Sequence, residues 1–211
     1  MGMTQGYLLN CNCFSNQELF LQGMGRLSSF RRKKVNHAKS LQAKYQRLGA
    51  GVLLDQALRQ RGLSEKEMEY MVDTNGKPFF AHCSNLFFSL SHSGDWAACT
   101  LSDQQVGVDV QVLSEYNARV SERCFSKEEA KVLAQLSGEE RDREFTRLWV
   151  RKESLVKYFG TWKKQETAPK VMDFYDEVHV GVCTEDDSHV SFKRLYINEK
   201  EELMIDLFGK M

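Results

Sequence analysis

The segment that most constrains the fold of this chain runs from Arg147 to Gly160. Its polar and aromatic residues recur at intervals of three and four, so at 3.6 residues per turn they lie along one stripe of a helix. The stripe consists of Trp149, Lys152, Glu153, Val156, Lys157 and Gly160. Half-buried charges of this kind lose hydration unless they are paired or a ligand completes them. A carboxylate between two lysines suits a metal ion and a polyphosphate, although a solvated helix face with a Glu153–Lys157 ion pair explains the same spacing.

Length and composition predict a globular chain. The 211 residues can bury one core, or two of about 100 residues each. Lys+Arg 29 balances Asp+Glu 29, so no overall field directs the chain to nucleic acid. No apolar run reaches the roughly 18 residues of a membrane span. The six cysteines lack zinc-site spacing and the first residues do not resemble a secretory signal, so we expect a reduced, cytoplasmic protein.

A basic block interrupts this charge balance. Residues 26–47 contain eight lysines and arginines and no acid. Such a block suits a phosphorylated ligand or an acidic partner. A solvated helix face explains it equally well from the sequence alone.

In the first half of the chain we expect one long helix and several short strands. The apolar period across residues 38–61 predicts the long helix. A shorter helix over residues 15–21 is expected to end before Gly23 and Gly25. The expected strands cover residues 7–14, 68–73, 85–90 and 96–101. A polar loop is expected over residues 91–95.

The second half repeats this pattern. Its first strand, over residues 105–111, places three valines on one face and Asp109 with Gln111 on the other. Helices are expected over residues 117–124, from the capping box at Ser126, and over residues 143–159, and further strands over residues 174–183, 190–197 and 203–208. The predicted organisation is therefore α+β, in two similar halves at residues 1–104 and 105–211.

Five short motifs stand out against this apolar scaffold. They read Gly76-Lys77-Pro78, Ser91-His92-Ser93, Gly107-Val108-Asp109-Val110-Gln111, Phe125-Ser126-Lys127-Glu128-Glu129 and Trp149-Val150-Arg151-Lys152-Glu153-Ser154-Leu155-Val156-Lys157. Each motif alone is weak, since a single Ser-His pair or a single Asp at a strand end is common. Together and in this order they resemble the Sfp-type 4′-phosphopantetheinyl transferases, over about residues 26 to 160. The Trp-x-x-Lys-Glu-Ser-x-x-Lys motif is the most distinctive.

The resemblance implies a fold of two similar α+β halves with coenzyme A in the cleft between them. It implies a cytoplasmic, monomeric enzyme that moves the phosphopantetheine arm onto a serine of an acyl- or peptidyl-carrier protein. The reaction would need Mg²⁺ and would release adenosine 3′,5′-bisphosphate. No nucleic acid and no membrane would take part. Whether the carrier belongs to fatty-acid, polyketide or peptide assembly is open.

The resemblance also assigns roles to individual residues. Lys152 and Lys157 would neutralise phosphate charge. The other expected coenzyme A contacts are Ser91 and His92 at the phosphates, with His92 at the 3′-phosphate, Lys77 and Pro78 at the nucleotide end, and Arg31, Arg32 or Arg47 at the 3′-phosphate. The register of the last three is not fixed by the sequence.

The expected metal ligands are Asp109 and Glu153, both hard oxygen donors that Mg²⁺ prefers. Gln111 stands where most of the family has Glu, so we expect it to bind the metal weakly or through water. Glu153 is the expected general base, assisted by Lys157 at the catalytic centre. Glu129, the acid after Phe-Ser, is a less favoured alternative base.

Two other hypotheses remain at this stage. The chain could be a coenzyme A-binding module of the same fold with weakened catalysis, as Gln111 suggests. It could also be a different metal-dependent phosphoryl enzyme, but it lacks the clustered carboxylates of a two-metal site.

Overall fold

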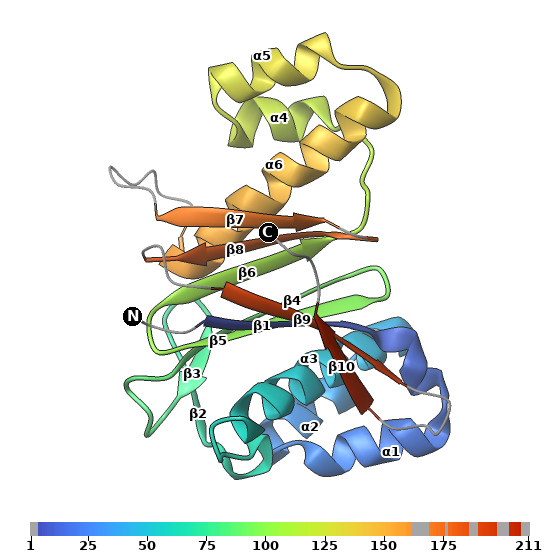
Figure 1. Cartoon of the computed structure of the whole chain (residues 1–211), viewed down its shortest axis with the longest axis vertical. Helices are drawn as coiled ribbons and strands as arrows, with labels where there is room; N and C mark the ends of the chain where they lie inside the picture. The colour runs from blue at the N-terminus through green and yellow to red at the C-terminus, as the bar shows by residue number, and fades with distance from the viewer. Residues whose placement is uncertain (1–3, 162–168, 176, 186–189, 198–202, 208–211) are drawn as a thin grey trace.

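Two β-sheets packed face to face, each covered on its outer face by a long helix, form the body of the molecule (Figure 1). The computed structural model describes residues 4–161, 169–175, 177–185, 190–197 and 203–207. The layers therefore follow the order helix, sheet, sheet, helix. Within these residues no helix is long and apolar enough to cross a membrane.

The first sheet has five strands in the order β10-β9-β1-β5-β4. These are β1 (Thr4–Asn10), β4 (Phe87–Ser93), β5 (Trp96–Ser102), β9 (Val190–Ile197) and β10 (Leu203–Leu207). Side chains alternate between its two faces, so Tyr7 and Leu9 pack toward the helix side while Leu8 packs toward the second sheet. A separate hairpin pairs β2 (Tyr70–Val72) with β3 (Pro78–Phe80).

The long helix α3 (Leu41–Arg59) covers the outer face of this sheet. It begins at an N-cap where the Ser40 hydroxyl accepts from the Ala43 N–H. Gly49 lies inside the helix because the chain approaches closely there, and a Cβ would meet the Cys11 sulfur at 2.4 Å. The shorter elements around it are the 3₁₀ turns η1 (Cys11–Ser15) and η2 (Glu65–Glu67) and the helices α1 (Gln17–Arg26) and α2 (Ser29–Asn36).

The second sheet has the strand order β6-β8-β7. Its strands are β6 (Val106–Gln111), β7 (Lys170–Tyr175) and β8 (His179–Thr184). The valines of β6 face the first sheet, and Gly107, Asp109 and Gln111 face the other way. The helix α6 (Gly138–Phe159) lies so close to this face that a Cβ on Gly107 would meet the Ser154 carbonyl oxygen at 2.1 Å. The helices α4 (Ala118–Cys124) and α5 (Lys127–Gln135) pack on the first half of α6.

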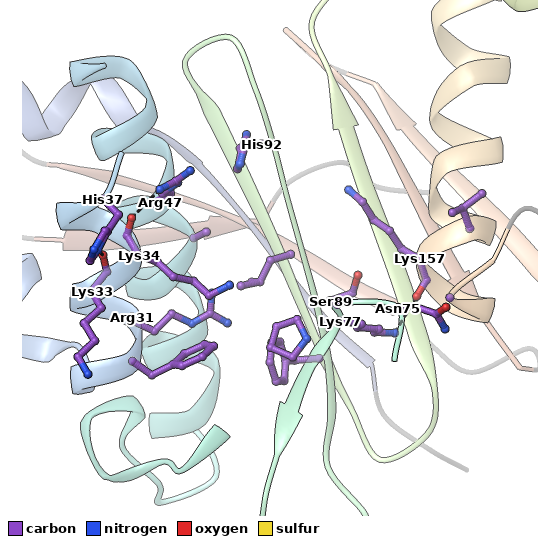
Figure 2. Close-up of a pocket in the computed structure, with 18 residues that line it drawn as sticks. Arg31, Lys33, Lys34, His37, Arg47, Asn75, Lys77, Ser89, His92 and Lys157 are labelled. Carbon is purple, nitrogen blue, oxygen red and sulfur yellow. Dashed lines mark hydrogen bonds between the residues drawn. The ribbon is translucent and has the colours of Figure 1, made fainter. Parts of the chain in front are cut away.

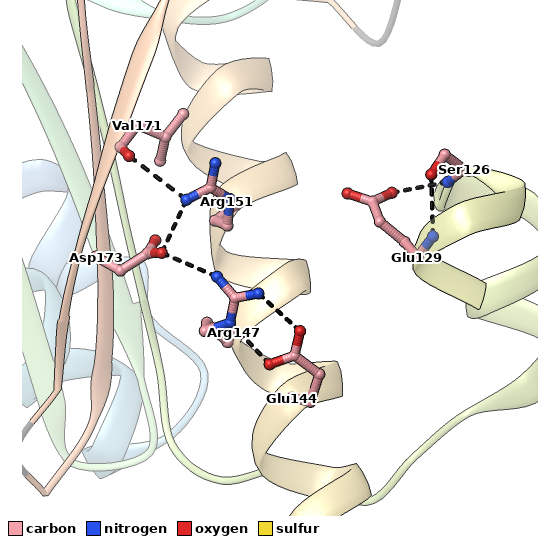
Figure 3. Close-up of polar contacts among 7 residues, drawn as sticks. All are labelled: Ser126, Glu129, Glu144, Arg147, Arg151, Val171 and Asp173. Atoms are coloured by element: carbon pink, nitrogen blue, oxygen red, sulfur yellow. Dashed lines mark hydrogen bonds and ion pairs between the residues drawn. The ribbon is translucent and has the colours of Figure 1, made fainter. Parts of the chain in front are cut away.

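Ion pairs fix α6 to β7 along the edge of the second sheet (Figure 3). Asp173 of β7 accepts from Arg147 at 3.2 Å and from Arg151 at 2.8 Å, and Arg147 also pairs with Glu144. These residues follow the stripe of α6 that faces β7. They therefore orient the helix and leave its other stripe for Glu153 and Lys157.

The two sheets share one strand order. In the first, β5 lies between β1 and β4, and in the second, β8 lies between β6 and β7, with antiparallel pairing throughout both triplets. In each triplet the helices separate the first strand from the next two along the chain. The strands β9 and β10 depart from this pattern because they extend the first sheet from its β1 edge, with β9 parallel to β1. The division at residues 104 and 105 stays a prediction, although these two late strands lie in the first sheet.

Serine side chains of β4 form hydrogen bonds to β6 and the residue after it, where these edge strands of the two sheets meet. The Ser89 hydroxyl accepts from the Val108 N–H at 3.0 Å, and Ser91 donates to Asp109 at 2.7 Å. Ser93 donates to the Gln111 side-chain oxygen at 2.8 Å and accepts from the Val112 N–H. Period-two spacing places the three hydroxyls on one face of β4.

Most predicted elements are confirmed, including the long helix over residues 38–61, the helix over 117–124 and the capping box at Ser126. The predicted loop over residues 91–95 is wrong, because β4 continues to Ser93 and the turn is confined to Gly94 and Asp95. The strand over residues 7–14 ends at Asn10, whose side chain caps a 3₁₀ turn.

Three further boundaries need correction. The predicted helix over residues 15–21 begins at Gln17 and runs through both glycines to Arg26, since tight packing of Gly23 on Leu48 favours the small residue. The single strand over residues 174–183 is two strands, β7 and β8. The helix predicted to begin at residue 143 begins at Gly138, which has a positive φ.

Candidate functional site

A pocket of about 740 Å³ opens between the two helix-covered units (Figure 2). One wall comes from α2 and α3, and the other comes from the β2–β3 turn and the last turns of α6, with β4 between them. Its cationic and imidazole side chains are Arg31, Lys33, Lys34, His37, Arg47, Lys77, His92 and Lys157. Among the described residues no aspartate or glutamate lines it. Such a cavity favours a ligand with several negative charges.

Arg31 is the most incompletely satisfied of these cations. Its side chain is 6% exposed, yet its Nε and Nη2 atoms donate no hydrogen bond within the described part of the chain. The guanidinium lies over the rings of Tyr70 and Phe88, at 5.2 and 5.5 Å from their centroids. A buried guanidinium with free donors loses hydration without compensation, so an anion in the pocket would satisfy it.

The neighbouring cations also contribute to the pKa shifts of two residues that line the pocket. Burial lowers the pKa of Lys34, and the nearby Arg31 and Arg47 lower it further. Burial likewise lowers the pKa of His92, with Lys157 and Arg47 adding to the effect. In both groups burial is the larger cause and the neighbouring cations add to it, while Asp109 opposes the shift at His92.

Lys77 connects the β2–β3 turn to the end of α6. Its ammonium donates to the carbonyl oxygens of Lys157 at 2.7 Å and Val106 at 3.3 Å. Burial lowers the pKa of Lys77, and Asp73 opposes that shift. A cation on the last carbonyls of a helix complements the negative end of its dipole. Lys77 thus has a structural role that holds Lys157 in place, besides lining the pocket.

Asp109, Ser91 and Lys157 form a closed triangle beside the pocket. Lys157 donates to the Asp109 Oδ1 atom at 2.7 Å and to the Ser91 hydroxyl at 2.7 Å, and that hydroxyl donates to the same Oδ1 atom. Asp109 is 2% exposed, whereas Lys157 also reaches the pocket surface. Lys157 therefore joins a buried carboxylate to the cationic wall of the pocket.

The side-chain oxygen of Gln111 is already engaged. It accepts from Ser93 at 2.8 Å, and the Gln111 amide nitrogen lies 3.4 Å from the Asp109 Oδ2 atom. In this arrangement Gln111 presents a donor to Asp109, and an oxygen facing a metal would require rotation of the amide. This geometry gives a physical reason for weak ligation by Gln111.

Glu153 is half-buried and lies one helical turn before Lys157. Burial raises its pKa, and the negative charge of Asp109 raises it further, while Lys157 opposes both effects. Its carboxylate makes no ion pair within the described residues. Two carboxylates that repel one another suit a divalent cation with hard-oxygen preference, so Asp109 and Glu153 fit Mg²⁺. No cluster of three or more His, Cys, Asp or Glu side chains with metal-binding geometry occurs in the described ranges, so a ligand would have to complete the coordination.

Glu129 and Lys152 pair with each other, away from the pocket lining. Their side chains lie 3.1 Å apart, and Glu129 also accepts from the Ser126 N–H in the capping box (Figure 3). Partial burial raises the pKa of Glu129, but the hydrogen bonds from Ser126 and Lys152 outweigh burial and lower it overall. A carboxylate held in this way is a poor proton acceptor.

The structure therefore gathers part of the predicted set in one pocket. Its lining includes Lys77, Pro78, His92, Lys157, Arg31 and Arg47. Ser91, Asp109 and Glu153 lie beside it through Lys157, whereas Arg32 and Lys152 do not line it. The roles of all these residues stay predictions.

Sequence reasoning missed Lys33, Lys34 and His37, which line the same wall. The signal was present in the basic block. Arg31 and Lys34 are three residues apart and Lys33 and His37 are four apart, so one helix face presents them to the pocket.

Comparison with known proteins agrees with this geometry. Residues 105–203 match the family model described as the 4′-phosphopantetheinyl transferase superfamily. The 4′-phosphopantetheinyl transferase AcpT of Salmonella typhi is 32% identical over 177 residues, covering 76% of this chain and 90% of that protein. The 4′-phosphopantetheinyl transferase psf-1 of Bacillus pumilus is 32% identical over 98 residues, 46% of this chain and 42% of the relative.

The match to other relatives is also partial. The 4′-phosphopantetheinyl transferase Sfp of Bacillus subtilis (strain 168) is 30% identical over 102 residues, 48% of this chain and 46% of that protein. The chain thus matches less than half the length of these two Bacillus relatives. The match to the Salmonella protein nevertheless spans nearly all of that relative at more than 30% identity, so the chain belongs to the 4′-phosphopantetheinyl transferase family.

Proposed function

We propose that this protein transfers the 4′-phosphopantetheine arm of coenzyme A to a serine of an acyl- or peptidyl-carrier protein, with Mg²⁺, and releases adenosine 3′,5′-bisphosphate. The observation that carries the proposal is the cationic pocket, which among the described residues is lined by no acid and which Lys157 joins to the Asp109 carboxylate. Its relatives carry the name of this activity.

Coenzyme A carries negatively charged phosphates, which would balance the cations that line the pocket. In this proposal the 3′-phosphate lies against Arg31 with Lys34, Arg47 and His92, and the pyrophosphate lies against Lys157. Lys77 and Pro78 line the nucleotide end. The pocket is then the ligand cleft between two duplicated units, a reading supported by their common strand order.

The protein's own acids fit a metal ion. Asp109 and Glu153 would hold Mg²⁺, with Gln111 contributing weakly or through water because Ser93 occupies its oxygen. Bound Mg²⁺ supplies charge neutralisation at the pyrophosphate.

In the transfer step Glu153 is the proton acceptor. The carrier serine oxygen forms a bond to the phosphorus that bears the pantetheine arm, and the bond from that phosphorus to the bridging oxygen breaks. The serine proton passes to the Glu153 carboxylate, whose raised pKa suits an acceptor. Lys157 and the cations of the pocket stabilise the negative charge that collects on the departing bisphosphate.

Compartment and oligomeric state follow from smaller observations. All six cysteines are free thiols, which supports a reducing, cytoplasmic location. One chain supplies both walls of the pocket, which supports a monomer.

The test compares acid-to-amide variants. Asp109→Asn and Glu153→Gln should each lower transfer to an apo carrier protein by about 100-fold or more, because each removes a charge at the reacting centre. Glu139→Gln is the matched control, since Glu139 lies on the same helix and pairs with the exposed Arg143. Full activity of either site variant would contradict the proposal.

A second candidate is a coenzyme A-binding module with weakened turnover. The engaged oxygen of Gln111 favours it, because Gln111 would then add little to the two carboxylates, Asp109 and Glu153, that would hold a metal. Tight coenzyme A binding without Mg²⁺-dependent transfer to any of several carriers would support this function, and Gln111→Glu should then restore transfer.

A further inference from the structure

A fully buried acid lies behind the basic wall of the pocket. Glu65, in the 3₁₀ turn η2, is 0% exposed. Its carboxylate accepts from the Ser28 N–H at 2.5 Å, from the Ser28 hydroxyl at 2.9 Å and from the Tyr70 hydroxyl at 2.6 Å. The Arg31 Nε atom lies 3.8 Å from it. Glu65 does not line the pocket, and the proposed reaction does not use it.

Burying a carboxylate of this kind costs free energy, because the ionised group loses its hydration. Burial raises the pKa of Glu65, and the hydrogen bonds from Tyr70 and Ser28 and the charge of Arg31 work against that shift. Apolar replacements of buried ion pairs are often as stable or more stable, so stability alone is a weak reason for a carboxylate here. Its side-chain contacts with Ser28 and Arg31 lie at the start of α2, which carries Arg31, Lys33 and Lys34, whereas its backbone N–H donates to Asp55 of α3.

The first contact fixes the start of α2. Ser28 is the N-cap of this helix, and its hydroxyl accepts from the Arg31 N–H at 3.4 Å while it donates to Glu65. The Ser28 N–H donates to Glu65 as well. Arg31, Lys33 and Lys34 follow in the next two turns. Glu65 therefore determines where the pocket-lining face of α2 begins.

The second contact orients the Arg31 side chain. The Tyr70 ring, held by the hydroxyl bond to Glu65, stacks on Phe30 with centroids 4.7 Å apart and lies beneath the Arg31 guanidinium. The 3.8 Å separation from Glu65 gives charge compensation but exceeds a hydrogen bond. The Nε and Nη2 atoms of Arg31 are buried without a hydrogen-bond partner among the described residues, and Arg31 itself lines the pocket.

We propose that Glu65 is a positioning residue that holds α2 and the Arg31 guanidinium so that the free donors of Arg31 bind a phosphate monoester of the ligand. The identity of that phosphate as the 3′-phosphate of coenzyme A rests on the function proposed above. Glu65 touches neither the ligand nor the reacting atoms.

The experiment measures how much the 3′-phosphate contributes to binding. The affinities for coenzyme A and for 3′-dephospho-coenzyme A are determined by calorimetry for the wild-type protein and for Glu65→Gln, Tyr70→Phe, Arg31→Met and Glu144→Gln. Glu144 is the matched control, since it is a partly buried acid that pairs with Arg147 of its own helix, outside the pocket lining. Thermal unfolding of each variant identifies those that fold.

The ratio of the two affinities is the readout, because a general loss of stability affects both ligands alike. Glu65→Gln should lower the coenzyme A affinity about tenfold, the worth of one charge-assisted hydrogen bond, and leave the dephospho-ligand unchanged. Arg31→Met should do the same. Tyr70→Phe keeps the ring and the fold, and should lose roughly threefold in the same ratio. Glu144→Gln should keep the wild-type ratio.

Three results would overturn the proposal. A wild-type ratio in Glu65→Gln and Tyr70→Phe, with the ratio lost in Arg31→Met, would remove the role of Glu65 alone. Tighter coenzyme A binding by Glu65→Gln would show that Glu65 competes with the ligand for Arg31. Equal wild-type affinity for the two ligands would contradict the assignment of a phosphate to Arg31. Such a result would leave the proposed transfer reaction untouched, because the variants of Asp109 and Glu153 test that reaction.

Discussion

At the scale of single residues, the site contains charged groups whose ionised form the folded protein disfavours and which a bound ligand would stabilise. Glu153 shows this most directly. Burial and Asp109 raise its pKa, so the folded state disfavours the ionised form relative to the unfolded chain. Below the unfolded pKa of about 4.3 the group is neutral in both states and carries no penalty. As pH rises through the higher folded pKa, the group ionises and stability is lost.

Replacing this carboxyl should therefore stabilise the ligand-free protein while it abolishes transfer. Glu153→Gln should raise the free energy of unfolding at pH 7 by less than about 1 kcal/mol, since the half-exposed group is screened by solvent. The gain should disappear near pH 4. Urea denaturation at both pH values measures it. Glu139→Gln should show no gain, and a loss of stability in Glu153→Gln at pH 7 would contradict the argument.

Single residues also show where sequence reasoning reaches its limit. Helical spacing predicted that Glu153 and Lys157 share a face, and the family resemblance predicted that Asp109 joins them. The partner of Gln111 could not be predicted, since Ser93 reaches it only where β4 of the first sheet contacts β6 of the second. The unpaired donors of Arg31 could not be predicted either, because they depend on the register of α2 and on Glu65. The same register leaves Arg32 out of the pocket lining.

At the scale of elements, the close approach of α6 to β6 sets the position of the carboxylates. Gly107 permits it, because there is no space for a side chain between β6 and the α6 backbone at Ser154 and Tyr158. The sequence predicted both elements from their periodicity. It did not predict that β4 extends through Ser93, because the serines of β4 look like a loop until β6 supplies their hydrogen-bond partners.

Gly107→Ala should therefore damage both stability and the site. The new Cβ would meet backbone atoms that cannot rotate away, so we expect a loss of about 3 kcal/mol or more in the free energy of unfolding. Gly25→Ala is the control, since nothing lies within 4 Å of its Cβ in the exposed part of α1. It should gain roughly 0.5 to 1 kcal/mol from helix propensity. Equal effects of the two substitutions would contradict this account of the helix–strand contact.

At the scale of the whole molecule, the two units share a strand order, yet they do not divide cleanly along the chain. The prediction of two α+β halves rested on counting helices and strands, and counting cannot tell which sheet a strand joins. The strand β9 pairs with β1 from Thr4 to Leu9, and a Cβ on Gly6 would meet the Phe192 ring at 2.1 Å. This long-range pairing ties the end of the chain to its beginning.

A fragment of residues 1–104 should consequently fail to fold alone. Without β9 the edge of β1 is unpaired, and Leu8 loses the core it shares with the second sheet. Circular dichroism and amide-proton dispersion in NMR spectra measure the outcome. Co-expression of fragments 1–104 and 105–211 is the control, and should recover folded protein. An independently folded 1–104 fragment would contradict the role given to β9.

The most direct test of the central claim is mass spectrometry of an apo carrier protein after incubation with this protein, coenzyme A and Mg²⁺, with EDTA as the metal-removal control. The account predicts a gain of about 340 Da on the carrier, the mass of one phosphopantetheine arm, that EDTA abolishes. No gain on any of several acyl and peptidyl carriers, with coenzyme A still bound, would contradict the proposed transfer.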